Sequence, residues 1–242
     1  MMTKTKAIVL RNVKYGDNSL IVDMLTERSG RVSFMVRLPK SSKGKIRRNL
    51  FIPLSILEVD FETKPSATLL RLKDVRLVSP LPSLLSNPYK LSIGLFLSEF
   101  LVYATRDEND NVPLYNYVEN SLLWLDGVED NFFNFHLVFM MRMTRFVGFL
   151  PYTADYQDGN YFDRINGSFC DRAPLHSHFL MPSDASKIGL LMRLGYPTMH
   201  LCKMTRNERN RCLDVILDYY RLHIPGFPEL KSYHILKELF QS

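Results

Sequence analysis

The first 80 residues alternate between apolar and polar side chains along several short segments, the period of a β-strand with one buried face. In residues 55–62, for example, Leu57, Val59 and Phe61 alternate with acidic residues. Strands are predicted at residues 6–13, 20–26, 31–37, 55–62 and 68–77. Because one-faced strands in so short a stretch must pair with one another to hide their edges, the pattern predicts a small closed barrel.

A five-stranded Greek-key barrel of the oligonucleotide/oligosaccharide-binding (OB) type is the economical arrangement. An SH3-like barrel is the alternative, because the number of strands does not separate the two. On the polar faces of the last two strands, Glu58 is expected to pair with Arg71 or Lys73.

The apolar period changes after the Pro- and Ser-rich segment 79–88, which marks a domain boundary. Residues 1–80 are predicted to form the OB domain and residues 81–242 a helical domain, so the fold class is α+β. Helices are predicted at residues 89–105, 112–125, 130–149, 183–194, 205–224 and 230–239. Residues 150–182 show no such period and are predicted to be an irregular insertion.

Positive charge is concentrated in the OB domain. Residues 1–80 hold 16 Lys and Arg against 7 Asp and Glu, a net charge of +9, whereas the remaining 15 and 18 give −3. The segment RLPKSSKGKIRR at 37–48 contains no acidic residue and has Pro, Ser and Gly typical of a loop. From its residues alone this basic segment is either a solvated connection or a contact for a polyanion such as nucleic acid.

The composition narrows the function class. Three cysteines without a C-x-x-C pair predict a reducing compartment and no zinc ribbon: Cys170, Cys202 and Cys212. The apolar stretch 91–104 is interrupted by Ser98 and Glu99 and is too short to span a membrane. Gly-rich phosphate loops and nucleophile motifs are absent from the sequence. These features predict a cytoplasmic protein that is not an enzyme and does not contact a membrane.

Four stretches in fixed order, AIVLRNVKYGDNSLIVDMLTERSGRVSFMVRL, the basic segment, PLSILEVDF and ELKSYHILKEL, together resemble the RecO family of bacterial DNA repair proteins. The resemblance covers nearly the whole chain and rests on the GDNSL turn, the TERSGR hairpin and the closing ELKS helix. It implies an N-terminal OB barrel and a C-terminal helical domain.

The same resemblance implies a non-enzymatic recombination mediator that binds single- and double-stranded DNA and anneals complementary strands. It further implies contact with the tail of single-stranded-DNA-binding protein and, together with RecR, help in loading RecA onto DNA coated by that protein. The alternative function is a scaffold whose barrel binds protein or RNA.

For the basic segment, the resemblance favours the polyanion contact. The predicted nucleic-acid-binding residues are Arg37, Lys40, Lys43, Lys45, Arg47, Arg48, Arg71 and Lys73. For Arg71, Lys73 and also Lys14, a solvated face is an equal alternative. Tyr15 and Phe34 are the candidates for base stacking. Phe34 shares its face with other apolar residues, which favours the core.

The aromatic and Met-rich helix predicted at 130–149 suits a core better than a partner groove. On it, Arg142 and Arg145 are predicted to suit an acidic peptide tail. Many members of the family bind zinc through four cysteines in the irregular segment, but here Cys170, His176 and His178 offer three ligands at most. We therefore expect no metal or other cofactor. The alternative is packing by aromatic residues: Tyr152, Tyr156, Tyr161, Phe162, Phe169 and Phe179.

The basic segment generates the first prediction. Replacing Lys43, Lys45, Arg47 and Arg48 together by Ala should lower DNA affinity by roughly tenfold at moderate salt, because each lost phosphate contact removes counterion release. Stability should change by no more than about 0.5 kcal/mol per exposed substitution. A fluorescence-anisotropy titration beside a circular-dichroism melt measures both, and unchanged DNA binding would contradict the prediction.

Overall fold

The computed structural model describes residues 2–39, 46–63, 67–106 and 108–239. The described chain forms two compact units. The first contains the residues up to Gly127 together with Leu230–Leu236, and the second contains Val128–Glu229 and the residues from Lys237 onward. The division into residues 1–80 and 81–242 stays a prediction.

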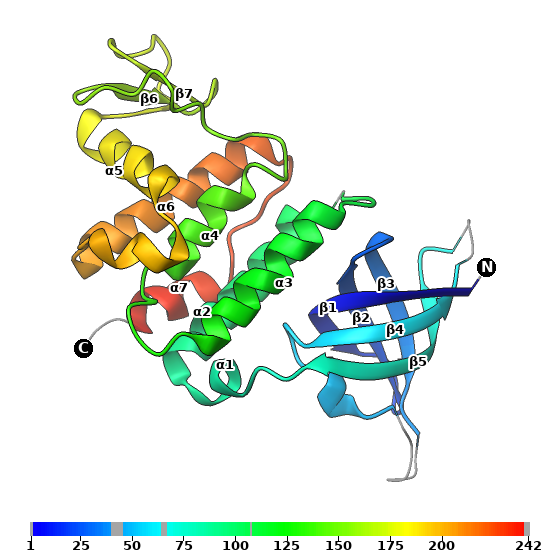
Figure 1. Cartoon of the computed structure of the whole chain (residues 1–242). Helices are drawn as coiled ribbons and strands as arrows, with labels where there is room; N and C mark the ends of the chain where they lie inside the picture. The colour runs from blue at the N-terminus through cyan, green and yellow to red at the C-terminus, as the bar shows by residue number, and fades with distance from the viewer. Residues whose placement is uncertain (1, 40–45, 64–66, 107, 240–242) are drawn as a thin grey trace. The chain divides into compact units, whose positions relative to one another are not determined.

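The five N-terminal strands form a closed barrel in the order β1-β2-β3-β5-β4 (Figure 1). They are β1 (Met2–Lys14), β2 (Ser19–Thr26), β3 (Gly30–Arg37), β4 (Ile56–Glu62) and β5 (Leu70–Ser79). All neighbours are antiparallel except β3 and β5, which pair in parallel at Phe34–Leu70 and Met35–Arg71. Because β5 lies between β3 and β4 instead of following chain order, the barrel is of the predicted OB type.

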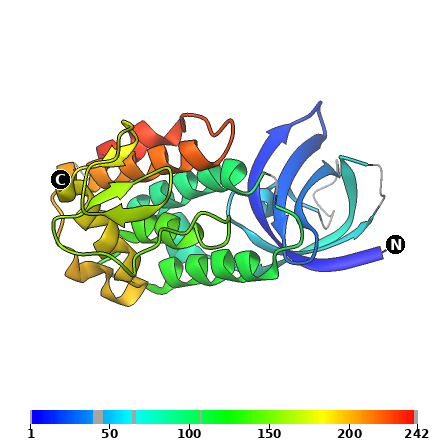
Figure 2. The same cartoon turned by 90° about the horizontal axis from the view of Figure 1, so that it is seen from above.

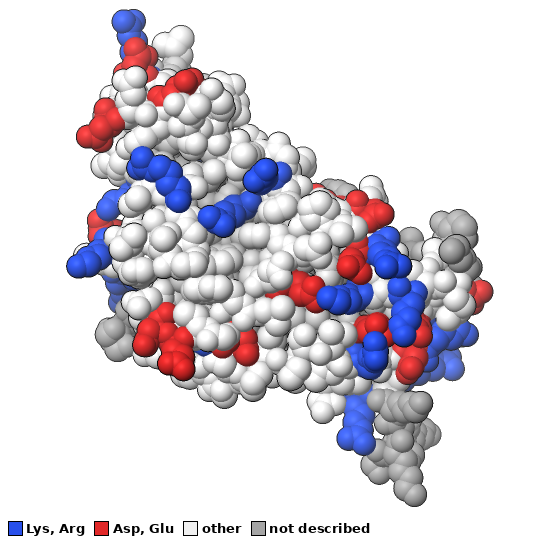
Figure 3. All heavy atoms as spheres, viewed as in Figure 1, with Lys and Arg blue, Asp and Glu red and all other residues white. Residues whose placement is uncertain are grey.

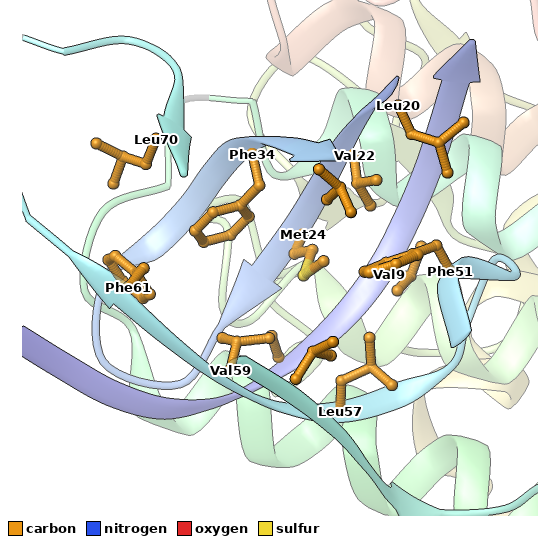
Figure 4. Close-up of a cluster of buried hydrophobic side chains, with 13 residues drawn as sticks. Val9, Leu20, Val22, Met24, Phe34, Phe51, Leu57, Val59, Phe61 and Leu70 are labelled. Atoms are coloured by element: carbon orange, nitrogen blue, oxygen red, sulfur yellow. The ribbon is translucent and has the colours of Figure 1, made fainter. Parts of the chain in front are cut away.

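The barrel core consists of the inward side chains of all five strands (Figure 4). Phe34 on β3 and Phe61 on β4 are fully buried, with their ring centroids 5.0 Å apart in an edge-to-face arrangement. Phe51 joins them from the short 3₁₀-helix η1 (Arg48–Phe51). Phe34 is therefore a core residue and does not present its ring to bases.

Three helices follow the barrel in the first unit: α1 (Pro82–Ser86), α2 (Pro88–Ala104) and α3 (Val112–Gly127). Asn87 caps α2 by accepting from the backbone N–H of Tyr89 at 2.9 Å, and Asn111 caps α3 by accepting from the backbone N–H of Leu114 at 3.0 Å. The hydroxyl of Ser98 on α2 donates to the carbonyl of Leu10, at a bulge in β1. The apolar circumference of α2 is thus used for packing, and none of the helices in the described residues is long and apolar enough to cross a membrane.

Glu99, which interrupts the apolar run of α2, binds the start of α7 (Ser232–Leu239). Its carboxylate accepts from the backbone N–H of Lys231 at 2.9 Å and of Ser232 at 2.8 Å, and from the Ser232 hydroxyl at 2.5 Å. A carboxylate at a helix N-terminus satisfies the free N–H groups there and interacts favourably with the helix dipole. The ELKS sequence is therefore the point at which the C-terminal segment is fastened to α2.

The second unit contains helices α4 (Phe135–Met143), α5 (Pro182–Arg193) and α6 (Arg206–His223) and the 3₁₀-helix η2 (Tyr196–Leu201). The helix predicted at 130–149 is shorter than expected at both ends, because Asn131 has φ +63° before the start at Phe135 and Gly148 has φ +89° after the end at Met143. A small sheet, β7-β6-β8, lies within the segment predicted to be irregular (Figures 1 and 2). Its strands are β6 (Tyr161–Asp163), β7 (Ser168–Cys170) and β8 (Phe179–Leu180). They are too short to show a sequence period.

Gly30, the first residue of β3 after the β2–β3 turn, provides a stability prediction. Its φ is +57°, and a Cβ there would overlap the backbone of Glu108 and Asn109. Gly30→Ala should therefore destabilise the protein by about 2–4 kcal/mol, combining left-handed backbone strain with overpacking. Gly16→Ala is the matched control, because Gly16 has φ +67° and nothing within 4 Å. Urea unfolding should show only about 1 kcal/mol for the control, and equal losses would contradict the steric account.

Candidate nucleic-acid interface

Several cations of the barrel are held in ion pairs. Lys4 and Arg76 contact Glu58 at 2.8 and 2.6 Å. The hydrogen bond from Arg76, which has the largest effect, and the one from Lys4 lower the pKa of Glu58 to about 2. The expected pairing of Glu58 with Arg71 or Lys73 is wrong. A register shift between β4 and β5 places Arg76 opposite Glu58.

The side chains of Arg37, Arg71 and Lys73 point outward from β3 and β5 and are exposed. Among the described residues, none of these three side chains has an ion-pair partner. Exposed cations that are not neutralised by a carboxylate are the groups that phosphates attract most strongly.

The outward faces of four strands bring an apolar row to Arg71. Val13 on β1 lies opposite Ile21 on β2, Ile21 opposite Met35 on β3, and Met35 opposite Arg71 on β5. Val13 is 52% exposed, and Ile21 and Met35 are half-buried. We call Val13, Ile21, Met35 and Arg71 the outer row. It offers apolar contact for bases and ends in a cation for a phosphate.

A neighbouring row has the same character. Tyr15, 55% exposed, donates its backbone N–H to the Ser19 carbonyl at 2.9 Å, and Ser19 lies opposite Arg37. Tyr15 is therefore the accessible aromatic candidate at this face, in contrast to Phe34. An aromatic ring and a guanidinium at the two ends of one row match the groups that hold single strands.

The short pairing of β3 with β5 leaves hollows beside these rows. One, of about 140 Å³, is lined by Met35, Val36, Arg37, Ile46, Arg71 and Leu72. A second, of about 400 Å³, is lined by Glu62, Ala67, Leu69, Leu70, Arg71 and Lys73. Because Arg71 borders both, its guanidinium is the cation best placed to meet a group that enters either hollow.

Of the other Lys and Arg residues predicted to bind nucleic acid, only some lie in the part of the chain that the structure describes. Arg47 and Arg48 are exposed at the start of η1, and Lys14 is exposed at the end of β1. Lys40, Lys43 and Lys45 lie outside the described residues. Their proposed contact with nucleic acid remains a prediction.

Asp23 fixes the part of the sheet that adjoins the outer row. Its buried carboxylate accepts from Arg11 at 2.5 Å, from Arg31 at 3.1 Å and from the Ser33 hydroxyl. Arg31 also donates to the Val102 carbonyl at the end of α2. Burial opposes ionisation of Asp23, but the hydrogen bonds from Ser33 and Arg11 outweigh it and lower its pKa. Sequence reasoning missed this group, although a single acidic residue in the apolar segment LIVDMLT was the available signal.

In the second unit, the apolar stripe of α4 is core, as predicted, since its Phe, Leu, Val and Met side chains are buried. Arg142 is exposed, yet its Nε donates to the Leu194 carbonyl at 3.1 Å and its guanidinium lies 5.9 Å from the centre of the Tyr196 ring. Arg145 is exposed one turn further along the chain. The pairing of these arginines with an acidic tail remains a prediction.

The small sheet is held by aromatic packing of the kind expected from the sequence. Phe169 contacts Tyr156 and Phe162 with ring centroids 4.8 and 4.9 Å apart. Tyr161 contacts Phe179 at 5.7 Å. His176 is bound to Asp163 at 3.3 Å, and within the described ranges no group of three His, Cys, Asp or Glu side chains is arranged to hold a metal ion.

The barrel order and the helical region after it define the class of OB-barrel proteins with a C-terminal helical part. Family models described as Recombination protein O N terminal and C terminal match residues 1–81 and 85–234. The DNA repair protein RecO of Phocaeicola vulgatus is 50% identical over 99% of this chain and all of its own length. Those of Bacteroides fragilis and Flavobacterium psychrophilum are 48% and 33% identical with the same coverage. The chain belongs to the RecO family of DNA repair proteins.

Asp23→Asn tests the buried network. At neutral pH this substitution should lower the free energy of unfolding by about 3–5 kcal/mol, because Arg31 would remain buried without its carboxylate partner. Since the folded-state pKa of Asp23 lies below its ordinary 3.8, its contribution is complete above that pH and is lost as the pH falls through the lower folded value.

Urea unfolding of parent and variant across this range should therefore show a difference that shrinks on acidification. Asp74→Asn, at an exposed carboxylate of β5, is the control and should stay within about 0.5 kcal/mol of the parent. A difference between Asp23→Asn and the parent that is independent of pH would contradict the assigned role.

Proposed function

We propose that this chain is a recombination mediator that acts by binding, and that its barrel holds single- and double-stranded DNA with little base preference. The observation that carries the proposal is the outer row, in which exposed or half-buried apolar side chains end at Arg71 beside Arg37, and neither arginine has an ion-pair partner among the described residues. The family and the name of its relatives as DNA repair proteins support the choice of DNA as ligand.

The two kinds of group in this surface have separate tasks. Arg37, Arg71 and Lys73 contact phosphates, which carry no sequence information. Val13, Ile21 and Tyr15 contact bases, which are accessible in a single strand and stacked inside a duplex. Duplex binding therefore relies on the cations alone, whereas single strands gain the apolar contacts as well.

Membership of the family supports finer proposals about partners. We propose that the chain anneals complementary strands, contacts the tail of single-stranded-DNA-binding protein, and together with RecR helps RecA to load. All of these steps consist of binding and exchange, so they need no catalytic group.

An RNA- or protein-binding scaffold is the competing function. The outer row contains no group that distinguishes a ribose from a deoxyribose, so its geometry does not choose between DNA and RNA. A parallel titration with RNA of the same length tests which of the two the barrel prefers. Preference for RNA would favour the scaffold.

The barrel surface yields a direct prediction. Replacing Arg37, Arg71 and Lys73 together by Gln should weaken binding of a labelled oligothymidylate by roughly tenfold, and should reduce the log–log salt slope by about 2, since each phosphate contact contributes about 0.7 for single strands. Fluorescence anisotropy over a salt series measures both quantities.

The control is Lys4→Gln with Arg28→Gln, two exposed cations elsewhere on the barrel. This control should leave the salt slope almost unchanged. The proposal fails if the triple variant binds as the parent does, or if the parent shows no salt dependence. Thermal melts of all variants exclude loss of the barrel as the cause.

A further inference from the structure

Four carboxylates of the second unit are held in ion pairs. They are Asp184 with Arg211 at 2.6 Å, Glu208 with Lys187 at 2.8 Å, Asp214 with Lys237 at 2.9 Å and Asp218 with Arg221 at 2.7 Å. The net charge of −3 for residues 81–242 therefore says little about where free charge lies.

Three arginines stand at the C-terminal ends of α4 and α5. They are Arg142, Arg145 and Arg193, all exposed. Among the residues that the structure describes, none of them forms an ion pair. Figure 3 shows several Lys and Arg side chains on the face of the second unit that α4 and α5 present.

Two of these guanidinium groups are held against aromatic rings. Arg142 lies 5.9 Å from the ring centre of Tyr196, and its Nε donates to the carbonyl of Leu194 at 3.1 Å. Arg193, the residue before Leu194, lies 5.5 Å from the ring centre of Tyr156. Tyr156 in turn packs against Gly189 on α5, where an added Cβ would lie 3.3 Å from the ring.

This arrangement pre-organises positive charge at a solvent-exposed surface. A guanidinium stacked on a ring keeps N–H groups at its edge that are free to meet a phosphate oxygen. Tyr156 and Tyr196 are partly exposed, but Tyr196 also stacks on Phe135 with ring centroids 4.7 Å apart and Tyr156 packs against Phe169 at 4.8 Å, so each leaves only part of its ring accessible. We call Arg142, Arg145, Arg193, Tyr156 and Tyr196 the arginine surface.

The surface suits nucleic acid better than the acidic tail that the sequence predicts for Arg142 and Arg145. A peptide tail needs pockets for its apolar side chains as well as a cation for its carboxylates. The Phe and Met side chains of α4 are buried, so this helix presents only charge. Charge and aromatic surface without an apolar pocket are the features of a sequence-independent contact with a nucleic-acid strand.

We propose that the arginine surface is a second contact for single-stranded nucleic acid, so that one chain holds one strand on its barrel and another on its second unit. This inference rests on the proposed function and deepens it, because annealing requires two strands to be held by the same molecule or complex. The ligand is a single strand without sequence preference.

The test measures the capture of a second strand. Full-length protein is bound to biotinylated oligothymidylate on beads, and retention of a dye-labelled oligothymidylate of the same length is then measured. Because the two strands cannot pair with each other, retention requires two contacts. Sedimentation with labelled strands in solution gives the number of chains in the bridged complex.

The test variant is Arg145→Gln with Arg193→Gln. Arg142 is left in place because it bonds the Leu194 carbonyl. The matched control is Arg211→Gln with Arg221→Gln, which removes the same charge from side chains paired with Asp184 and Asp218. We expect the test variant to retain roughly tenfold less second strand while its affinity for one strand on the barrel changes by less than about threefold. The control should behave like the parent.

Several outcomes overturn the inference. They are unchanged capture by the test variant, an equal loss in the matched control, and a bridged complex that contains two chains with one strand each. A labelled acidic peptide whose binding is lost in the test variant, with second-strand capture intact, would assign the surface to a peptide tail. A parent that binds one strand and captures no second refutes this inference alone. A parent that binds no strand refutes the proposed function as well.

Discussion

The parallel pairing of β3 with β5 is the contact on which the rest of the barrel depends. It joins the strands through only two residue pairs, Phe34–Leu70 on the inside and Met35–Arg71 on the outside. The inner pair belongs to the core that holds the strands together, and the outer pair completes the outer row. Because the pairing is so short, the barrel opens on both sides of it into the hollows that Arg71 borders. One closure contact thus sets both the stability of the barrel and the geometry of its candidate interface.

Charge in this protein is organised by pairing, and the counts of charged residues hide this organisation. On the barrel, Glu58 occupies Lys4 and Arg76, and Asp23 occupies Arg11 and Arg31. Arg37 and Arg71, at the ends of the outward rows, are exposed and form no ion pair among the described residues. In the second unit, four ion pairs occupy carboxylates, whereas the arginines at the C-terminal ends of α4 and α5 form no ion pair among the described residues. The position of each Lys or Arg side chain relative to the carboxylates, more than the net charge, decides which surface attracts a polyanion.

The period of apolar residues was enough to predict the five strands, a small closed barrel and most helices, because burial imposes that period directly. It left the OB and SH3-like types open, and the strand order of the structure identifies the OB type. The register in which β4 pairs with β5 could not be predicted from this period. The shift that brings Arg76 to Glu58 arises from closing the barrel, which no local pattern encodes. The helix predicted at 130–149 extends beyond the observed end of α4 at Met143. Strands as short as Phe179–Leu180 contain too few residues to show a period. Of the candidate site, Arg37 and Arg71 could be predicted from charge, but their alignment with Met35 and Ile21 depends on pairing between distant strands. The roles of Asp23 and Glu99 could not be predicted either, since the partners of each come from other elements.

The two proposed surfaces differ in a way that suits annealing. The outer row lies on a rigid sheet and combines apolar side chains with cations, so it can hold one strand through both bases and phosphates. The arginine surface lies at helix ends and offers mainly charge, so the second strand is held weakly and can slide. Two strands must shift along each other until their bases match, and a second contact as strong as the first would trap wrong registers. A firm contact for one strand and a loose, sequence-independent contact for the other therefore let base pairing itself select the final register.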